Sequence, residues 1–130
     1  MRLGYIIVYV PDVAETIGFY ERAFGLSRRF VHPSGEYAEM ETGSTALGFA
    51  AAAFVRGNGM EFQSLRPDQP PVAMEIALVT DDVAAAVSRA AAAGAVIVQQ
   101  PVKKPWGQTV AYVRDLNGTL VELCTEVAPA

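Results

Sequence analysis

The sequence predicts an α+β fold of two tandem β-α-β-β-β modules, whose sheets lie side by side as a half-open mixed barrel with the helices outside. Three observations predict it. An apolar run followed by a helix-capping acid occurs twice, so that Asp82 is the counterpart of Asp12. Each copy continues into a helical stretch that ends near a glycine. Three short segments separated by turn residues then follow each helix, as in an antiparallel meander.

The first module is predicted over about residues 1–52. Its first strand, residues 3–10, has no polar side chain, so we expect both faces of this strand to be covered. Asp12 is a good N-cap for a helix at about residues 13–24. Breakers such as Pro33-Ser34-Gly35 separate the three strands that follow, at about residues 26–32, 37–41 and 45–51.

Residues 53–71 are predicted to connect the two modules, because they lack the periodic spacing of apolar residues that marks a helix or strand. They contain the turn-forming stretches Gly57-Asn58-Gly59 and Pro70-Pro71. Loops of this length are often binding elements, which makes Phe54 a candidate for covering a pocket. The alternative is that Phe54 packs on the edge of the sheet.

The second module is predicted over about residues 72–126. Its first strand, at about residues 72–79, leads to Asp82 as the cap of an alanine-rich helix at residues 83–93. The turn Asp115-Leu116-Asn117-Gly118 joins the last two strands. The three strands after the helix are expected at about residues 95–100, 108–114 and 119–125.

Composition limits the possible functions. The chain has 130 residues, of which 52% are hydrophobic and 18% charged, as expected for a single domain with one core shared by two halves. Its net charge of −4, with basic pairs only at Arg28-Arg29 and Lys103-Lys104, argues against nucleic acid as a partner. The apolar start is too short to span a membrane. The one cysteine, Cys124, forms no intrachain disulfide, which favours a cytoplasmic location and a buried, unreactive thiol.

Two motifs resemble the vicinal oxygen chelate superfamily, which includes glyoxalase I, extradiol dioxygenases and bleomycin resistance proteins. One is Tyr9-Val10-Pro11-Asp12 running into Gly18-Phe19-Tyr20-Glu21-Arg22-Ala23-Phe24-Gly25-Leu26. The other is Arg114-Asp115-Leu116-Asn117-Gly118-Thr119-Leu120-Val121-Glu122-Leu123. The resemblance implies the glyoxalase/bleomycin resistance fold, a site in the concave sheet and, usually, a homodimer.

The resemblance also implies four positions for metal ligands, on the first and last strand of each module. Here they are Tyr5, Gly48, Glu75 and Glu122, and only Glu122 is of the usual residue type. A catalytic divalent metal needs three or four donors, whereas glycine offers none and a neutral tyrosine is a poor one. We therefore expect no bound cofactor. The alternative is a divalent metal such as Zn, Ni, Fe or Mn held by Glu75 and Glu122.

Glu75 and Glu122 are the candidate catalytic residues. If both carboxylates project into the concavity, their like charges and their burial raise the pKa of at least one of them. Such a pair can act as a proton shuttle or bind a cation. The alternatives are that one of them faces solvent, or that Tyr5 simply hydrogen-bonds a glutamate. Candidates for ligand binding include aromatic side chains that could form a stacking wall, although strand aromatics often belong to a core. The ligand-binding candidates are Tyr5, Tyr9, Gly48, Phe49, Phe54, Trp106 and Tyr112.

Two functions remain open at this point. The first is a binding protein without the catalytic metal, which holds a small organic ligand, for which a positive charge is one option. The second is a metal-dependent lyase, isomerase or dioxygenase of the glyoxalase type that uses Glu75 and Glu122. In both cases the expected partners are a small molecule and a second copy of the chain.

Overall fold

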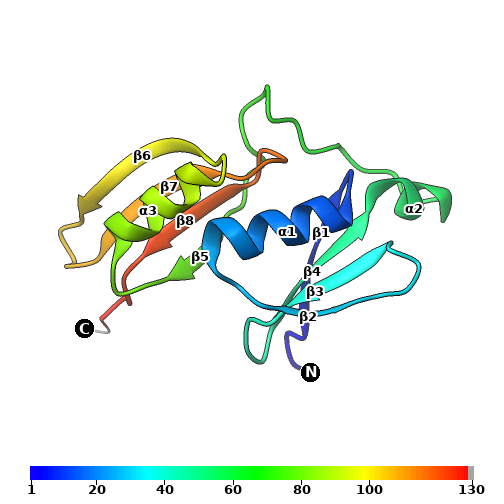
Figure 1. Cartoon of the computed structure of the whole chain (residues 1–130), viewed down its shortest axis with the longest axis horizontal. Coiled ribbons are helices and arrows are strands. Elements are labelled where there is room, and N and C mark those ends of the chain that lie inside the picture. The colour runs from blue at the N-terminus through cyan, green and yellow to red at the C-terminus, as the bar shows by residue number, and fades with distance from the viewer. Residues whose placement is uncertain (129–130) are drawn as a thin grey trace. The chain divides into compact units, whose positions relative to one another are not determined.

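The computed structural model describes residues 1–128. The chain divides into two compact units, one of residues 1–65 and one that begins at Arg66. Each unit has the element order β-α-β-β-β and one four-stranded sheet, and the first unit adds a short helix (Figure 1). The predicted α+β class with two β-α-β-β-β modules is confirmed.

The first unit has a mixed sheet in the order β1-β4-β3-β2, in which β1 runs parallel to β4 and the other pairs are antiparallel. The short helix α2 lies in the stretch where the sequence indicated only a connection. Its elements are β1 (Tyr5–Val10), α1 (Val13–Phe24), β2 (Arg28–Val31), β3 (Tyr37–Met40), β4 (Ala46–Ala51) and α2 (Ala52–Gly57).

Helix α1 begins and ends where its capping residues predict. The Asp12 carboxylate accepts a hydrogen bond from the backbone N–H of Glu15, which satisfies one donor of the first turn. At the other end Gly25 takes the left-handed conformation, with φ of 67°, and its N–H donates to the carbonyl of Glu21. The helix bounds are therefore those read from the sequence.

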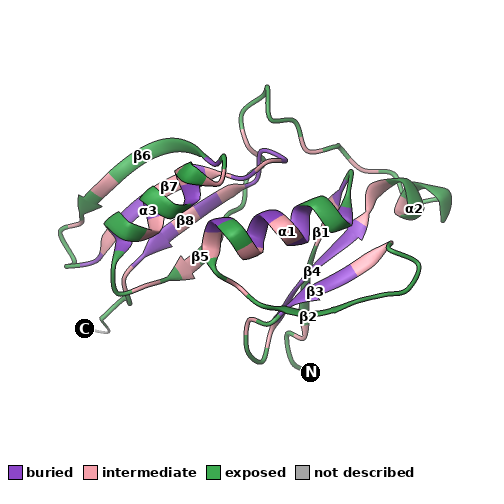
Figure 2. Cartoon of the chain, in the orientation of Figure 1, coloured by how far each residue is buried: buried purple, intermediate pink, exposed green. Residues whose placement is uncertain are grey.

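The core of the first unit lies between α1 and one face of the sheet. Figure 2 shows a buried stripe on α1 and buried strands beneath it. Tyr20 packs on Phe49 of β4, with ring centroids 4.9 Å apart. Ile17, Val10 and Met40 complete this layer and are almost fully buried. The opposite face of the sheet carries Tyr5, Ile7, Tyr37, Glu39 and Gly48.

The expectation that both faces of the first strand are covered is wrong. Tyr5, Ile6 and Ile7 are all exposed. Among the described residues, strand β1 pairs only with β4 and so forms the edge of its sheet, while α1 packs on β3 and β4. The absence of polar side chains therefore did not predict burial at this edge.

The second unit repeats the plan with the sheet order β5-β8-β7-β6, in which β5 is parallel to β8. The Asp82 carboxylate caps α3 by accepting from the N–H of Ala85. Helix α3 packs on β6, β7 and β8, and Val87 of the helix is buried, as are Val113 and Val121 of the sheet. The elements are β5 (Ile76–Val79), α3 (Val83–Ala92), β6 (Val96–Lys103), β7 (Thr109–Arg114) and β8 (Leu120–Cys124).

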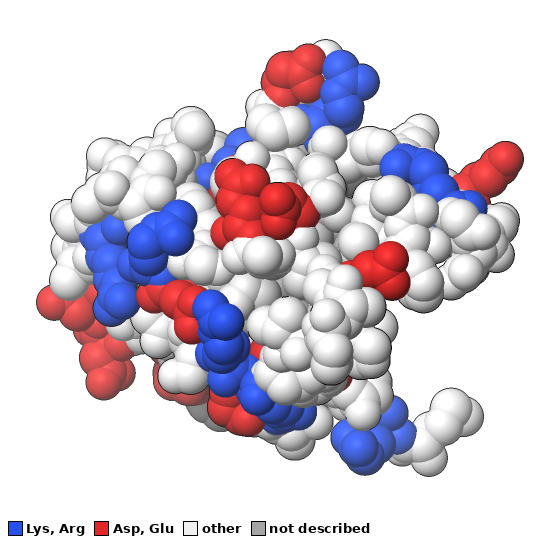
Figure 3. Space-filling view, turned by 45° about the vertical axis from the view of Figure 1, so that its right-hand side comes forward, with Lys and Arg blue, Asp and Glu red and all other residues white. Residues whose placement is uncertain are grey.

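Charged side chains pair locally. In the first unit Arg28 pairs with Glu21 at 2.7 Å, and in the second Arg66 pairs with Asp68 at 3.1 Å. On the face drawn in Figure 3, basic side chains accordingly lie next to acidic ones and form no extended basic patch. Among the described residues, every helix is too short or too polar to cross a membrane.

Candidate functional site

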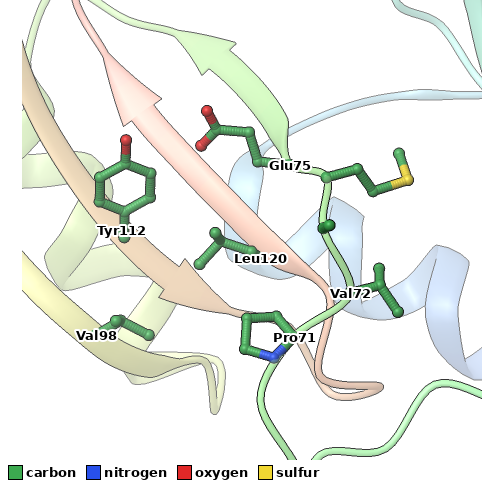
Figure 4. Close-up of a pocket in the computed structure, with 8 residues that line it drawn as sticks. Pro71, Val72, Glu75, Val98, Tyr112 and Leu120 are labelled. Atoms are coloured by element: carbon green, nitrogen blue, oxygen red, sulfur yellow. The ribbon is translucent and has the colours of Figure 1, made fainter.

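A hollow of about 540 Å³ opens on the face of the second sheet that α3 does not cover. Its wall is mostly apolar, and Figure 4 shows the Glu75 carboxylate and the Tyr112 ring over the same hollow, with Leu120 between them. The chain segment before β5 forms one rim. The lining residues are Pro71, Val72, Ala73, Met74, Glu75, Val98, Tyr112 and Leu120.

Glu122 and Tyr112 form a hydrogen-bonded pair on this open face. They are directly opposite each other in the antiparallel pairing of β7 and β8, and the Tyr112 hydroxyl donates to the Glu122 Oε1 at 2.9 Å. This hydrogen bond, partial burial and the carboxylate charge raise the pKa of Tyr112 to about 12. The hydroxyl is therefore a neutral donor at physiological pH.

Glu75 lies just before β5 and belongs to the same face, because Ala77, two residues later, is paired with Glu122. Within residues 1–128 its side chain has no hydrogen bond and no ion pair. Desolvation first, and then the negative charge of Glu122, raise the pKa of the Glu75 carboxyl. The prediction that Glu75 and Glu122 share one face is thus consistent with the strand register.

Cys124 follows Glu122 on the same face. It is a buried free thiol whose Sγ lies 3.8 Å from the carbonyl oxygen of Leu78. Burial and the nearby Glu122 carboxylate raise the pKa of this thiol to about 12, so it stays protonated and a poor nucleophile. The prediction of a buried thiol is confirmed.

The rim of the hollow is tied to the β7–β8 hairpin. The Arg114 guanidinium donates to the carbonyl of Gly118 in the hairpin and to the carbonyls of Arg66 and Pro67, which precede the lining residues 71–75 in the chain, at 2.9, 3.1 and 3.2 Å. Gly118 has a φ of +89°, and a Cβ placed on it would lie 2.8 Å from the Cα of Pro67. Gly118 therefore allows Pro67, four residues before the rim, to pack closely on the hairpin.

Position 48 in the first unit is occupied in an unexpected way. A Cβ built on Gly48 would lie only 2.6 Å from the hydroxyl of Tyr37, which occupies the space that a side chain there would need. Tyr37 in turn donates to Glu39 at 2.7 Å. Sequence reasoning missed both residues. Their spacing of two on one strand, which puts a tyrosine and a glutamate on the same face, is the part of this arrangement that the sequence shows.

The aromatic candidates lie in different environments. Phe49 is 0% exposed and belongs to the core under α1, on the opposite side of β4 from Gly48. The Tyr9 ring packs at a tilt of 59° on the ring of Phe62, with centroids 4.8 Å apart. Phe54 is 46% exposed on α2, and Trp106 is 60% exposed with its Nε1 donating to Gln108. Of the seven ligand-binding candidates, only Tyr112 lines the hollow, and ligand contacts of the others stay predictions.

Comparison with known proteins identifies the family. The family model described as the Glyoxalase/Bleomycin resistance protein/Dioxygenase superfamily matches residues 2–123. The chain belongs to this superfamily. The resemblance stated from the two motifs is therefore confirmed. Among curated proteins, no sequence matches the chain.

Solved structures from this superfamily share the fold at low sequence identity. A glyoxalase-related enzyme from Fulvimarina pelagi matches with a TM-score of 0.80 and 21% identity, over 96% of this chain and 88% of that one. A glyoxalase/bleomycin resistance protein/dioxygenase family enzyme from Burkholderia phytofirmans PsJN gives 0.79 and 19%, over 98% and 100%. TioX from Micromonospora sp. ML1 gives 0.72 and 23%, over 96% and 98%. These similarities support the fold alone.

The donor set does not fit the metal of metal-dependent superfamily members. Glu75 and Glu122 are the only carboxylates at the four expected positions, since Tyr5 and Gly48 occupy the other two. Within residues 1–128 no group of three or more His, Cys, Asp or Glu side chains is placed to hold a metal ion. A catalytic metal site needs three or four such donors, so we derive no chemical step through a metal.

Glu75 is expected to make the protein less stable as pH rises. Its native pKa is raised above the ordinary value of a glutamate, so the native state holds the proton more tightly and stability falls as pH rises through the range in which Glu75 titrates. Glu75→Gln should therefore raise the free energy of unfolding at neutral pH by less than about 1 kcal/mol, because solvent screens much of the interaction. Urea unfolding at about pH 7 and pH 3 measures this. The stability gained in Glu75→Gln should vanish at about pH 3. A gain that is the same at both pH values would contradict a raised pKa of the Glu75 carboxyl.

Proposed function

We propose that this chain binds a small organic molecule with an apolar body and a positively charged nitrogen, in the hollow of the second unit and without a catalytic metal. The supporting observation is the Glu75–Glu122 carboxylate pair, which lies beside an apolar hollow and has no basic partner among residues 1–128. The apolar wall would take the body of the ligand, and the carboxylates its charge.

Electrostatics favour a cation over an anion or a neutral molecule. Two carboxylates that raise each other's energy are both stabilised by a positive charge placed between them. Tyr112 leaves Glu122 with acceptor capacity, because its hydroxyl uses only one of the carboxylate oxygens. Within residues 1–128, no hydrogen bond uses an acceptor site of Glu75. A protonated amine, with several N–H donors, matches this arrangement.

Titration with a matched pair of fragments tests the proposal. Benzylammonium and its neutral analogue benzyl alcohol are added separately, and backbone amide shifts are followed by NMR. We expect benzylammonium to shift the amides of residues 71–75, Tyr112 and Glu122, with affinity roughly 10-fold above that of benzyl alcohol. Glu75→Gln and Glu122→Gln should each remove most of this preference, whereas Glu61→Gln, in the first unit, should not.

Two results would contradict the proposal. Equal affinity for the two fragments, or an unchanged preference in both glutamine variants, would show that the carboxylates do not recognise charge. Stoichiometric divalent metal in the purified protein, measured by elemental analysis, would contradict the proposal that the chain binds its ligand without a metal. The predicted homodimer is checked by analytical ultracentrifugation, and it and the cytoplasmic location stay predictions.

A second candidate function is enzymatic, a lyase or isomerase of the glyoxalase type in which Glu75 moves a proton. The raised pKa of the Glu75 carboxyl supports it, because a carboxyl that titrates closer to neutrality can both take up and release a proton. Turnover of an α-ketoaldehyde–thiol adduct, with and without added divalent ions, separates the two functions. Turnover that is lost in Glu75→Gln would favour the enzyme.

A further inference from the structure

The open face of the first unit carries its own tyrosine–glutamate pair. Tyr37 and Glu39 are two residues apart on β3, and the Tyr37 hydroxyl donates to the Glu39 Oε2 at 2.7 Å. Glu39 is only 5% exposed, whereas Tyr37 is half-buried. The Glu39 carboxylate is therefore the more buried member of the pair, and Tyr37 is the member that solvent reaches.

The strand register shows that this pair is the counterpart of Tyr112–Glu122, with the roles of the strands exchanged. Gly48 is paired with Ile7 on one side and Glu39 on the other, as Glu122 is paired with Ala77 and Tyr112. In the second unit the hydroxyl comes from β7 and the carboxylate from β8.

In the first unit the carboxylate comes from β3, and the hydroxyl of Tyr37 fills the space over Gly48 of β4. Both units thus present the same hydrogen-bonded pair on the open face of their sheet, built from different positions. Tyr37 can occupy this place only because residue 48 is a glycine. A Cβ at position 48 would lie 2.6 Å from the Tyr37 hydroxyl.

The charges around Glu39 leave an excess of negative charge. Arg29 forms a bidentate pair with Glu41, at 2.8 and 2.9 Å, and reaches Glu39 at the longer distance of 3.5 Å. Two carboxylates therefore share one guanidinium, so the group carries a net charge of −1 when all three are ionised. From the sequence alone, Arg28-Arg29 is only a basic pair, and the sharing of Arg29 by two carboxylates is visible only in the structure.

The geometry gives the Tyr37 hydroxyl a defined polarity. Its proton is directed at Glu39, so its lone pairs are the groups available to a ligand, and the bond to a carboxylate makes them better acceptors. Burial, followed by the bond to Glu39, raises the pKa of Tyr37 well above its usual range, so the hydroxyl stays neutral. The ring of Tyr5, 54% exposed on the same face, offers an aromatic surface for a cation.

We propose that the Tyr37 hydroxyl, oriented by Glu39 in the space over Gly48, is a second binding site, specific for an organic ammonium group. Tyr37 contacts the ligand, and Glu39 is a positioning residue. The proposal is independent of the function assigned to the second unit, because every residue that it uses lies in the first unit.

The experiment uses the full chain with the double change Glu75→Gln and Glu122→Gln, which removes the recognition of charge in the second unit. Benzylammonium chloride is titrated and amide shifts are followed by NMR, with benzyl alcohol as the neutral probe. We expect benzylammonium to shift the amides of β3 and β4 around Tyr37 and Gly48, and benzyl alcohol to shift them at roughly 10-fold higher concentration, because one charge-assisted hydrogen bond is lost.

Variants then assign the site. Tyr37→Phe should weaken benzylammonium binding about 10-fold, since it removes the acceptor. Tyr20→Phe is the control, because it also removes one tyrosine hydroxyl from the first unit but lies in the core beneath α1, on the other side of the sheet, and it should leave binding unchanged. Glu39→Gln keeps an acceptor for the Tyr37 proton but removes the charge, and it should weaken benzylammonium binding several-fold without changing that of benzyl alcohol. Glu39→Gln also serves as the test if Tyr37→Phe does not fold.

The outcomes separate the two proposals. If the amides around Tyr37 do not respond to benzylammonium, or respond equally in Tyr37→Phe, the second site is overturned while the site at Glu75 and Glu122 is untouched. If the unmodified chain responds around Tyr37 but not around residues 71–75, the second site stands and the proposed function fails.

Discussion

Replacing Phe49 with alanine is expected to lower the free energy of unfolding by about 3–5 kcal/mol. Phe49 is fully buried in β4, and its ring packs on Tyr20 at 4.9 Å in the layer beneath α1. Truncation removes the apolar contacts and leaves a cavity that the surrounding strand and helix cannot fill. Chemical denaturation followed by circular dichroism measures the change.

Phe54→Ala is the matched control, because it makes the same truncation on α2, where Phe54 is 46% exposed. Its cost is expected to stay below about 1 kcal/mol. Should Phe49→Ala fail to fold, Phe49→Leu keeps most of the volume and should cost about 1–1.5 kcal/mol. Similar losses in Phe49→Ala and Phe54→Ala would contradict the placement of Phe49 in the core.

The contrast between Phe49 and Gly48 shows what strand periodicity can and cannot provide. Adjacent strand residues face opposite sides, so a strand that contains both can place only one of them on the open face. The sequence leaves open which side the helix covers. The register and the packing of α1 decide that Phe49 lies in the core and Gly48 on the open face. Residue type made Phe49 a candidate, whereas Gly48 was one because of the position that the resemblance implies.

Local signals predicted the elements well where capping or turn chemistry is strong. Asp12 and Asp82 each accept a backbone hydrogen bond at the start of a helix, and the predicted start of each helix is correct. Helix α2 has no such signal, because its N-cap is Ala51, which makes no side-chain hydrogen bond. Strand β5 begins at Ile76, later than predicted, because residues 72–75 form the rim of the hollow instead of pairing.

The candidate site was predictable only in part. The position of Glu122 followed from the strand pattern and the resemblance, whereas its bond to Tyr112 depends on the cross-strand register of β7 and β8. Gly48 was interpreted as a missing metal ligand. The structure adds that the hydroxyl of Tyr37 fills this space, which only a three-dimensional arrangement can show, because the two residues belong to different strands.

Gly118→Ala is expected to disrupt both the stability of the second unit and the rim of the hollow. Gly118 has a φ of +89°, which an L-residue adopts at a cost of about 1–2 kcal/mol. In addition, the new Cβ would lie 2.8 Å from the Cα of Pro67 and 3.0 Å from its nitrogen. Backbone atoms cannot swing away as the end of a side chain can, so the rim segment has to move. We expect a total loss of about 3 kcal/mol, measured by urea unfolding.

Gly107→Ala isolates the contribution of this contact. Gly107 has a similar φ of +95° in the same unit, but a Cβ there would meet nothing within 4 Å. It should therefore cost only the backbone strain, about 1–2 kcal/mol, and leave benzylammonium binding unchanged. Gly118→Ala should also weaken that binding, because Arg114 holds Arg66 and Pro67 against the hairpin, and residues 71–75 follow them in the chain. Equal losses of stability in the two variants would mean that the Gly118–Pro67 contact does not hold the rim in place.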